Sequence, residues 1–169
     1  MRDADRLFRD YHAPLVRYLT RRLGDRDWAE EVAQETFLRA LRQDRLENGR
    51  AWLFTVATNL VRDAARQDAR RRRHLELLRA EAEAEPRMVE SPASAMERAE
   101  ERAAARRALE QLAERDREAL LMREEGLDYH EIAAALGLAV GSVGTTLARA
   151  RRRLVEMFED RASGKTVGR

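Results

Sequence analysis

The chain has 169 residues, with 33 Lys and Arg, 31 Asp and Glu, and no cysteine. At roughly 100–200 residues per domain, this length allows one ordinary domain or two small ones. Without cysteine the chain can form no disulfide framework, no Cys-ligated metal site and no thiol nucleophile. Its apolar runs are far shorter than the ~18 residues of a membrane span, and its first residues hold no apolar signal region. We therefore expect a soluble, cytoplasmic protein with no membrane insertion.

The net charge of +2 conceals a segregation of charge along the chain. Residues 1–74 carry 17 basic and 12 acidic groups, residues 75–127 carry 9 and 14, and residues 128–169 carry 7 and 5. Two basic ends around an acidic middle suggest two contacts with a polyanion, joined by a part that avoids it. An acidic middle made of solvated helix faces explains the charge at least as well.

Apolar residues recur at helical spacing throughout, and glycine and proline are scarce. The first helix is expected to be kinked or divided at Pro14, because proline supplies no N–H. A second helix is expected from about Asp27, with an apolar stripe that ends at Leu41. A loop over 44–50 then leads to a third helix over about 51–73. Three helices with facing stripes can close one small core.

The third predicted helix has an apolar stripe and an opposite, polar face. The polar face presents Thr55, Thr58, Asn59, Arg62 and Arg66, followed by the arginine run 70–73. Further along, a stretch rich in Pro, Ser and Glu indicates a flexible acidic linker. The predicted fold is all-α, with two small helical domains at 1–78 and 96–160, the linker at 79–95, and a disordered tail at 161–169.

Residues 129–154 have the pattern of a helix-turn-helix. Gly137 lies at the turn, where a positive φ is needed, and the small Ala133 lies where the two helices approach. Val143 is expected to pack back onto the first helix, and Ser142 to cap the second. The second helix has an apolar stripe opposite a face of hydroxyls and arginines, which is typical of a helix that lies in a major groove. An ordinary helical hairpin with a solvated arginine face is the alternative.

Three segments together resemble a known family. Asp27–Leu41 closely resembles the second-region helix of bacterial sigma factors, and Arg50–Asp63 resembles the adjoining promoter-melting helix that reads the −10 element. Ile132–Leu154 resembles the helix-turn-helix that reads the −35 element. Their order and spacing match the small two-domain group, the extracytoplasmic-function sigma factors. The resemblance implies a promoter-specificity subunit that binds core RNA polymerase and directs initiation, without catalysis.

The resemblance also implies the protein partners. These are core RNA polymerase, bound through its β′ clamp coiled coil and its β flap, and an anti-sigma protein. Clamp docking is expected from Glu31, Gln34 and Glu35, whose spacing places them on one helix face where they can meet arginines. Leu38 beside them supplies the apolar element that an interface needs. The alternative is a solvated acidic face.

Promoter DNA is the remaining implied partner, at two places. On the third helix, Asn59 offers an amide that can read a base edge, while arginines hold the backbone. Trp52 and Phe54 can stack on bases, although core packing is favoured for Trp52. The expected −10 contacts are Asn48, Trp52, Thr55, Asn59, Arg62, Arg66 and Arg70. The expected −35 contacts are Ser142, Thr145, Thr146, Arg149, Arg152 and Arg153.

No catalytic residue, cofactor or metal site is predicted. The three histidines are scattered, no Gly-rich phosphate loop occurs, and the paired carboxylates are expected on solvated helix faces. Two other functions fit the helix-turn-helix. One is a stand-alone transcriptional regulator, which would dimerise on a palindrome. The other is a sigma-like adaptor that sequesters an anti-sigma protein and does not bind DNA.

Overall fold

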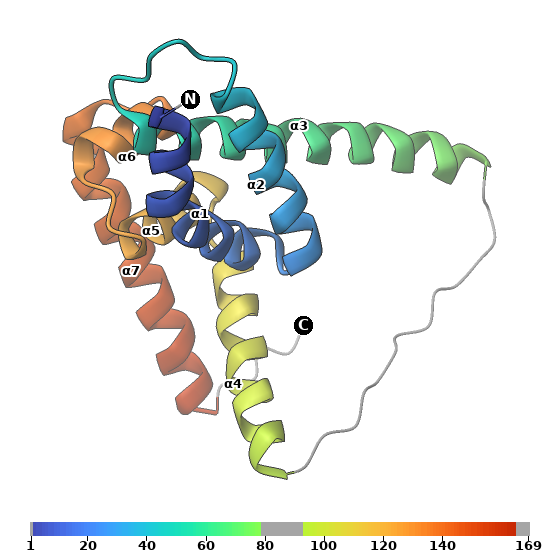
Figure 1. Ribbon diagram of the computed structural model, residues 1–169. Coiled ribbons are helices and arrows are strands. Elements are labelled where there is room, and N and C mark those ends of the chain that lie inside the picture. Colours follow the sequence, from blue (N-terminus) through green and yellow to red (C-terminus); the bar gives the residue numbers. More distant parts are fainter. Residues whose placement is uncertain (1, 79–92, 165–169) are drawn as a thin grey trace.

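The computed structural model describes residues 2–78 and 93–164, and in these ranges it has seven helices and no strand, which confirms the predicted all-α fold. The helices are α1 (Arg2–Leu23), α2 (Arg26–Ala40), α3 (Gly49–Leu78), α4 (Ala93–Glu110), α5 (Glu114–Glu124), α6 (Tyr129–Leu136) and α7 (Val140–Ala162). The first three form an N-terminal domain and the last four a C-terminal domain (Figure 1). Within the described ranges, no single helix is long and apolar enough to cross a membrane. Helices α6 and α7 reach the required length and apolar composition only when they are taken together, and the chain bends by 92° between them.

The predicted linker and tail lie partly outside the described residues. Of the linker, residues 79–92 are not described, whereas residues 93–95 form the first turn of α4. Helix α7 continues to Ala162, so the first two residues of the predicted disordered tail are helical. Residues 163 and 164 follow the end of α7, and residues 165–169 of the tail lie outside the described residues.

Helices α1, α2 and α3 pack around a core that includes Leu15, Leu19, Phe37 and Leu53. Helix α1 continues through Pro14, so of the two predicted outcomes, a kink or a division, the division does not occur. A proline inside a helix costs about 3 kcal/mol, and burial of each leucine that follows it contributes about 1.5–3 kcal/mol. The two leucines, which have no exposed surface, offset the missing hydrogen bond.

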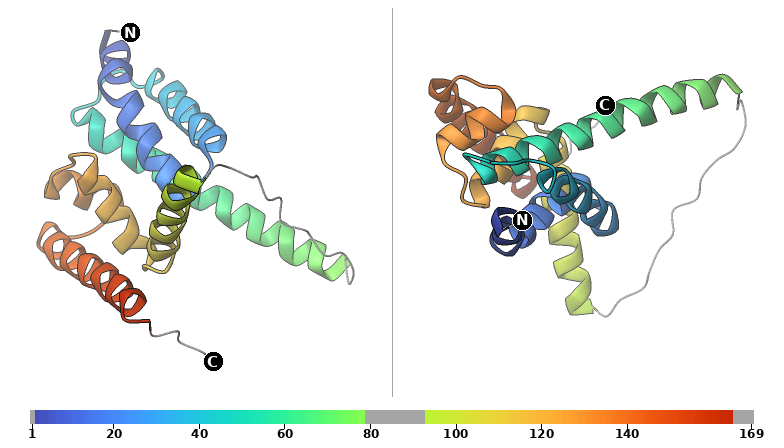
Figure 2. Two further views of the ribbon diagram at one scale, coloured as in Figure 1. Left: turned by 90° about the horizontal axis from the view of Figure 1, so that it is seen from below. Right: turned by 45° about the horizontal axis from the view of Figure 1, so that its top comes forward.

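Helix α3 starts earlier and ends later than predicted. The side chain of Asn48 caps it by accepting a hydrogen bond from the N–H of Ala51 at 3.1 Å. Beyond Val61, no α3 residue whose side chain is described is buried. This second half of α3 projects from the rest of the protein (Figures 1 and 2). It is therefore a surface that the protein's own core does not use.

Helices α6 and α7 form the predicted helix-turn-helix. Gly137 ends α6 with a φ of +63°, which confirms the predicted left-handed turn. Val143 has no exposed surface, because it packs in the core that α6 and α7 share. The predicted cap is wrong: α7 begins at Val140, and Ser142 lies inside its first turn. Helix α7 therefore begins at the apolar N-cap residue Ala139, without a hydrogen bond from a capping side chain.

The two domains are in direct contact. Helix α3 packs against α6, and α1 packs against α5. The views in Figure 2 show α5 and α6 beside the N-terminal helices, while α4 and the end of α7 extend away from them. Only the first half of α3 takes part in the contact between the domains, since its second half projects from the rest of the protein.

Candidate polymerase and nucleic-acid interfaces

Helix α2 carries an exposed face of acidic, amide and apolar groups. Glu31 and Gln34 are exposed, and Leu38 keeps 45% of its surface exposed. Glu35 is partly buried, and its carboxylate accepts a hydrogen bond from Nε of Arg39 at 2.8 Å. The four residues predicted for clamp docking thus lie on an accessible part of α2, with Glu35 already paired.

An exposed apolar patch adjoins this face. Phe8 of α1 and Leu41 at the end of α2 are exposed and line a shallow pocket with His12, Phe37 and Leu38. The rings of Phe8 and Phe37 are packed edge to face, with 5.1 Å between their centroids. Helical periodicity places Leu41 in the buried stripe, and this prediction is wrong. Exposed apolar groups beside polar ones are typical of a protein interface, which periodicity alone cannot distinguish from a core.

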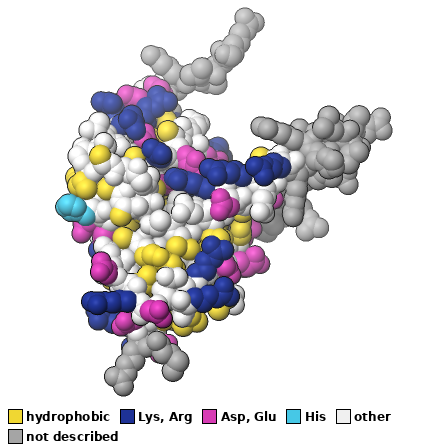
Figure 3. All heavy atoms as spheres, turned by 90° about the horizontal axis from the view of Figure 1, so that it is seen from above, with side chains coloured by type: hydrophobic (Ala, Val, Ile, Leu, Met, Phe, Trp, Pro, Cys, Tyr) yellow, Lys and Arg dark blue, Asp and Glu magenta, His cyan; other side chains and the backbone are white. Residues whose placement is uncertain are grey.

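Part of the polar face predicted for α3 is accessible. Asn59, Arg66 and Arg70 are exposed, and their spacing places them along one strip of the helix. Basic side chains gather along the projecting part of α3 (Figure 3). Thr55 is partly buried and donates its hydroxyl to the carbonyl oxygen of Ala51 at 2.7 Å, so only its oxygen lone pairs are available to a ligand.

Two other residues of α3 are buried, against prediction. Phe54 has no exposed surface and its ring packs against that of Tyr18 from α1, so it cannot stack on a base. Thr58 is also buried, and its hydroxyl shares a 2.8 Å hydrogen bond with the hydroxyl of Tyr18. Trp52 is partly buried against the core, as favoured from the sequence. The buried strip of α3 is wider than its apolar stripe because α1 crosses it here.

Arg62 is held by the C-terminal domain. Its Nη2 donates to Oε2 of Glu118, whose side chain has no exposed surface, at 2.5 Å. Asp116 on the same helix α5 is buried as well. The expectation that the carboxylates lie on solvated helix faces is therefore wrong for these two residues. A predicted DNA contact is instead paired inside the protein.

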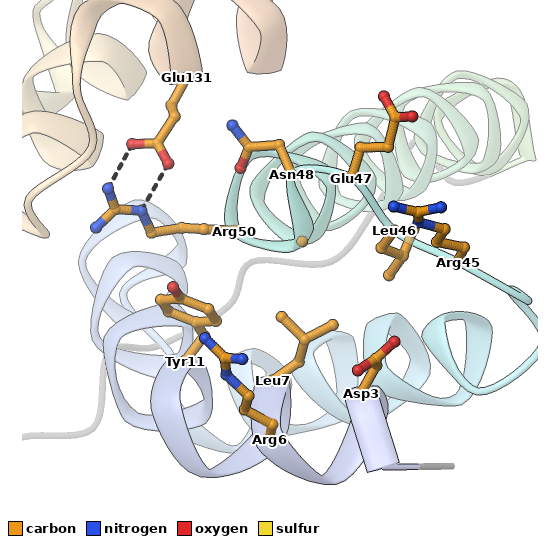
Figure 4. Close-up of a pocket in the computed structure, with 11 residues that line it drawn as sticks. Asp3, Arg6, Leu7, Tyr11, Arg45, Leu46, Glu47, Asn48, Arg50 and Glu131 are labelled. Carbon is orange, nitrogen blue, oxygen red and sulfur yellow. Dashed lines mark hydrogen bonds and ion pairs between the residues drawn. The ribbon is translucent and has the colours of Figure 1, made fainter.

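A polar pocket of about 330 Å³ lies where α3 begins (Figure 4). Asn48 lines it from the loop, and Arg6 and Tyr11 line it from α1. Arg50 donates from Nε and Nη2 to the carboxylate of Glu131 in α6, at 2.9 and 2.6 Å. This hydrogen bonding raises the pKa of the Arg50 guanidinium. The C-terminal domain therefore covers one side of the pocket, and sequence reasoning missed both members of the pair.

The outward face of α7 largely matches the prediction. Ser142, Thr145, Arg152 and Arg153 are exposed. Thr146 is buried instead, and its hydroxyl donates to the carbonyl oxygen of Ser142 at 2.8 Å. Each residue advances 100° around the helix, so Thr146 lies at the edge of the apolar stripe of α7. A residue at that edge is buried where the neighbouring helices cover more than the stripe itself. Thr146 is not available to DNA in this arrangement.

Arg149 is exposed on α7 but is already paired. Its Nε donates to Oδ2 of the buried Asp116 at 2.8 Å. This hydrogen bond raises the pKa of the Arg149 guanidinium. A second hydrogen bond from Nη2 makes the pair bidentate, which fixes the direction of the guanidinium plane. Asp116 thus orients an arginine on the outward face of the helix-turn-helix.

Comparison with known proteins assigns the family. Residues 7–71 match the family model of Sigma-70 region 2, and residues 102–154 match that of Sigma-70 region 4. The chain is 31% identical to the RNA polymerase sigma factor YlaC of Bacillus subtilis (strain 168) over 153 residues, which cover 88% of this chain and 87% of YlaC. It is 37% identical to the ECF RNA polymerase sigma factor EcfG of Rhodopseudomonas palustris (strain TIE-1) over 138 residues, which cover 78% and 71% of the two chains. The chain belongs to the extracytoplasmic-function sigma factors.

A solved structure shares the fold of this sigma factor. CnrH, in complex with the cytosolic domain of CnrY, has a TM-score of 0.65 and 25% identity, and the match covers 94% of this chain and 88% of CnrH. The protein is a sigma factor that directs promoter-specific initiation, its two sigma regions imply binding to RNA polymerase and promoter DNA, and the family consists of non-catalytic initiation factors. A stand-alone helix-turn-helix regulator would not account for the region 2 match in the N-terminal domain.

Proposed function

We propose that this sigma factor docks on core RNA polymerase through α2, holds the −10 element on α3 and reads the −35 element with α7. The observation that carries the proposal is that three exposed polar faces lie on three different helices. One chain can then hold the polymerase, an unpaired strand and a duplex at the same time. Because it works on the polymerase, the protein acts in the cytoplasm. The N-terminal domain comprises residues 1–78, and the −35 domain extends to residue 160.

Docking on the β′ clamp coiled coil is supported by the chemistry of the α2 face. Glu31 and Gln34 are free to accept hydrogen bonds from arginines of a partner. Leu38, Leu41 and Phe8 supply exposed apolar surface at its edge. A combination of charged and apolar groups of this kind provides both orientation and buried area.

Capture of the −10 strand is supported by α3 and the pocket at its start. Asn59 reads a base edge, and Arg66 and Arg70 hold phosphates along the projecting helix. The pocket wall formed by Asn48 receives a base that is turned out of the stack, a step that costs a few kcal/mol. Thr55 and Trp52 contribute from the partly buried edge of the site, and Arg62 joins it when its carboxylate partner is withdrawn.

Recognition of the −35 element is supported by the outward face of α7. Ser142 and Thr145 near its N-terminus face base edges or phosphates, and Arg152 and Arg153 hold the backbone. Arg149 is presented in a fixed direction by Asp116, which suits bidentate contact with guanine.

Two further protein contacts complete the proposal. The groove between α4 and α7, lined by Ala104, Ala108 and the exposed Phe158, provides an apolar seat for the β flap. CnrH is similar in fold and was solved with the cytosolic domain of CnrY. We infer that this sigma factor also binds a protein partner, an anti-sigma protein that holds it inactive.

In vitro transcription with core polymerase tests the assignments. Glu31→Arg combined with Gln34→Ala should abolish co-purification with polymerase and transcription, while the helical content measured by circular dichroism stays unchanged. Asn59→Ala should leave polymerase binding intact and reduce open-complex formation. The matched control is Glu124→Arg, an exposed charge reversal on α5, which should change neither polymerase binding nor open-complex formation. Retained polymerase binding by the α2 variant would contradict the docking assignment.

A further inference from the structure

A buried carboxylate of α5 faces an arginine on the outward side of α7. Asp116 is 3% exposed, and its carboxylate accepts hydrogen bonds from Nε of Arg149 at 2.8 Å and from Nη2 at 2.5 Å. Half of the arginine side chain is exposed, whereas only 4% of the aspartate side chain is. The pair therefore has one end fixed inside the protein and one end open to a ligand of α7.

The carboxylate of Asp116 is held in place by its helix as well as by burial. Asp116 is the third residue of α5, which begins at Glu114, and the positive end of a helix macrodipole favours a carboxylate in the first turn. Leu120 and Met122 of the same helix pack in the core. A short side chain on a fixed helix end has few conformations, so this carboxylate can fix the plane of a guanidinium group.

The pair is not needed to attach α7 to the rest of its domain. Val143, Leu147 and Ala150 of α7 have no exposed surface, and they already pack in the core. An ion pair with a buried carboxylate contributes little net stability, because removing the carboxylate from water offsets much of the attraction. The pair is better explained by what α7 binds than by how α7 packs.

The geometry of the pair leaves a defined set of donors for a ligand. A guanidinium group has five N–H bonds, and Asp116 accepts one from Nε and one from Nη2 of Arg149. Both N–H bonds of Nη1 and the second N–H bond of Nη2 remain. One from each nitrogen together form the fork at the end of the side chain, and such a fork matches the N7 and O6 acceptors of guanine in the major groove.

The carboxylate also favours a base edge over a phosphate as the ligand of Arg149. Phosphates attract arginines through charge, and the charge of Asp116 offsets much of that of the guanidinium beside it. Hydrogen bonds to a neutral base edge depend instead on the direction of the donors, which the pair fixes. Arg153 differs, since its partner Glu156 is an exposed carboxylate of the same helix at 3.6 Å, which is too far for a hydrogen bond.

Arg149 lies in one row with two other residues proposed to contact the −35 element. Thr145 precedes it by four residues and Ser142 by seven, so the three lie on the same side of α7, and all three are exposed. Residues near the N-terminus of the second helix of a helix-turn-helix contact base edges. Helical side chains lean toward the N-terminus, which directs the long side chain of Arg149 toward the same part of the groove.

We propose that Asp116 is a positioning residue for −35 recognition, which makes Arg149 the reader of one guanine base and not a phosphate contact. The inference rests on the proposed reading of the −35 element by α7. Asp116 does not itself reach DNA, because its side chain is buried behind the arginine, and it acts only through Arg149. The base preference of the promoter is therefore set partly from α5, a helix outside the helix-turn-helix.

Selection from a randomised promoter measures this base preference. Mapping the transcripts that the holoenzyme makes in vitro on genomic DNA supplies a natural promoter, whose −35 element is then randomised. Sequencing the duplexes that the holoenzyme binds gives the preference at each position. The wild type should prefer guanine at one position by about 5- to 150-fold, the range for one bidentate arginine–guanine pair, and Arg149→Ala should remove this preference.

Variants of Asp116 separate positioning from charge. Asp116→Ala should lower the guanine preference to about 2- to 12-fold, the square root of the wild-type value, because a mobile guanidinium keeps one of its two hydrogen bonds to the base. Asp116→Asn, which is similar in size and keeps one acceptor, should give an intermediate preference, and it replaces Asp116→Ala in the test if that variant loses helical content. The matched control is Glu156→Gln, which removes an exposed carboxylate beside Arg153 and should change no base preference.

A double variant tests whether Asp116 acts through the arginine. Asp116→Asn added to Arg149→Ala should change no base preference further. Positioning is overturned, and reading by α7 stands, if the folded Asp116 variants keep the wild-type guanine preference, if Asp116→Asn alters preferences without Arg149, or if the position that depends on Arg149 prefers another base. If the wild-type holoenzyme shows no base preference in the randomised element, the proposed role of α7 fails, and positioning fails with it.

Discussion

The hydrogen bond between Tyr18 and Thr58 joins α1 to α3 directly beneath the exposed Asn59. Both side chains are buried, and their hydroxyls lie 2.8 Å apart. Thr58→Val keeps the shape but leaves the Tyr18 hydroxyl buried without a partner, at an expected cost of about 1–3 kcal/mol in the free energy of unfolding. Tyr18→Phe should cost less, about 0.5–1.5 kcal/mol, because the Thr58 hydroxyl can rotate to donate to the carbonyl oxygen one turn back.

The double variant tests this reasoning. With both hydroxyls removed no buried polar group is left unpaired, so its cost should be about 1 kcal/mol below the sum of the single costs. Urea unfolding followed by tryptophan fluorescence reports on the N-terminal domain alone, since both tryptophans, Trp28 and Trp52, lie there. Additive single costs would refute the coupling, and a larger cost for Tyr18→Phe than for Thr58→Val would refute the assignment of the unpaired group.

Two further predictions concern pH and backbone conformation. Burial raises the pKa of Tyr18 above its ordinary value near 10, so the folded state holds this proton more tightly than the unfolded state. The contribution of Tyr18 to stability should be constant below about pH 10 and be lost as the pH rises further, and Tyr18→Phe should lessen this loss in a urea series. Gly137→Ala places a side chain at a φ of +63° and should cost about 1 kcal/mol, whereas Gly141→Ala, inside α7 with open space around it, should stabilise by up to about 1 kcal/mol. Thermal unfolding followed by circular dichroism measures both, and equal effects of the two glycine changes would contradict the conformational argument.

Features that depend on local chemistry can be predicted from the amino-acid sequence alone. Helical spacing and scarce glycine determine an all-α chain, and Gly137 is where a left-handed residue is required whatever surrounds it. The order of three motifs determined the family. The outward face of α7, with Thr145 and Arg152, also follows from helical projection, because the apolar stripe of α7 lies on the opposite side and is the side that packs into the core.

Which polar groups remain accessible depends on how the helices pack. Projection around α3 gives Thr58, Asn59 and Arg62 the same polar face, yet α1 buries Thr58 and α5 holds Arg62, leaving Asn59 exposed. Charge segregation along the chain indicates that opposite charges are available, but by itself it is equally consistent with contact with a polyanion and with solvated helix faces. Pairing Glu118 with arginines of a distant helix requires two domains to be brought together, and that arrangement is set by packing between surfaces far apart in the sequence.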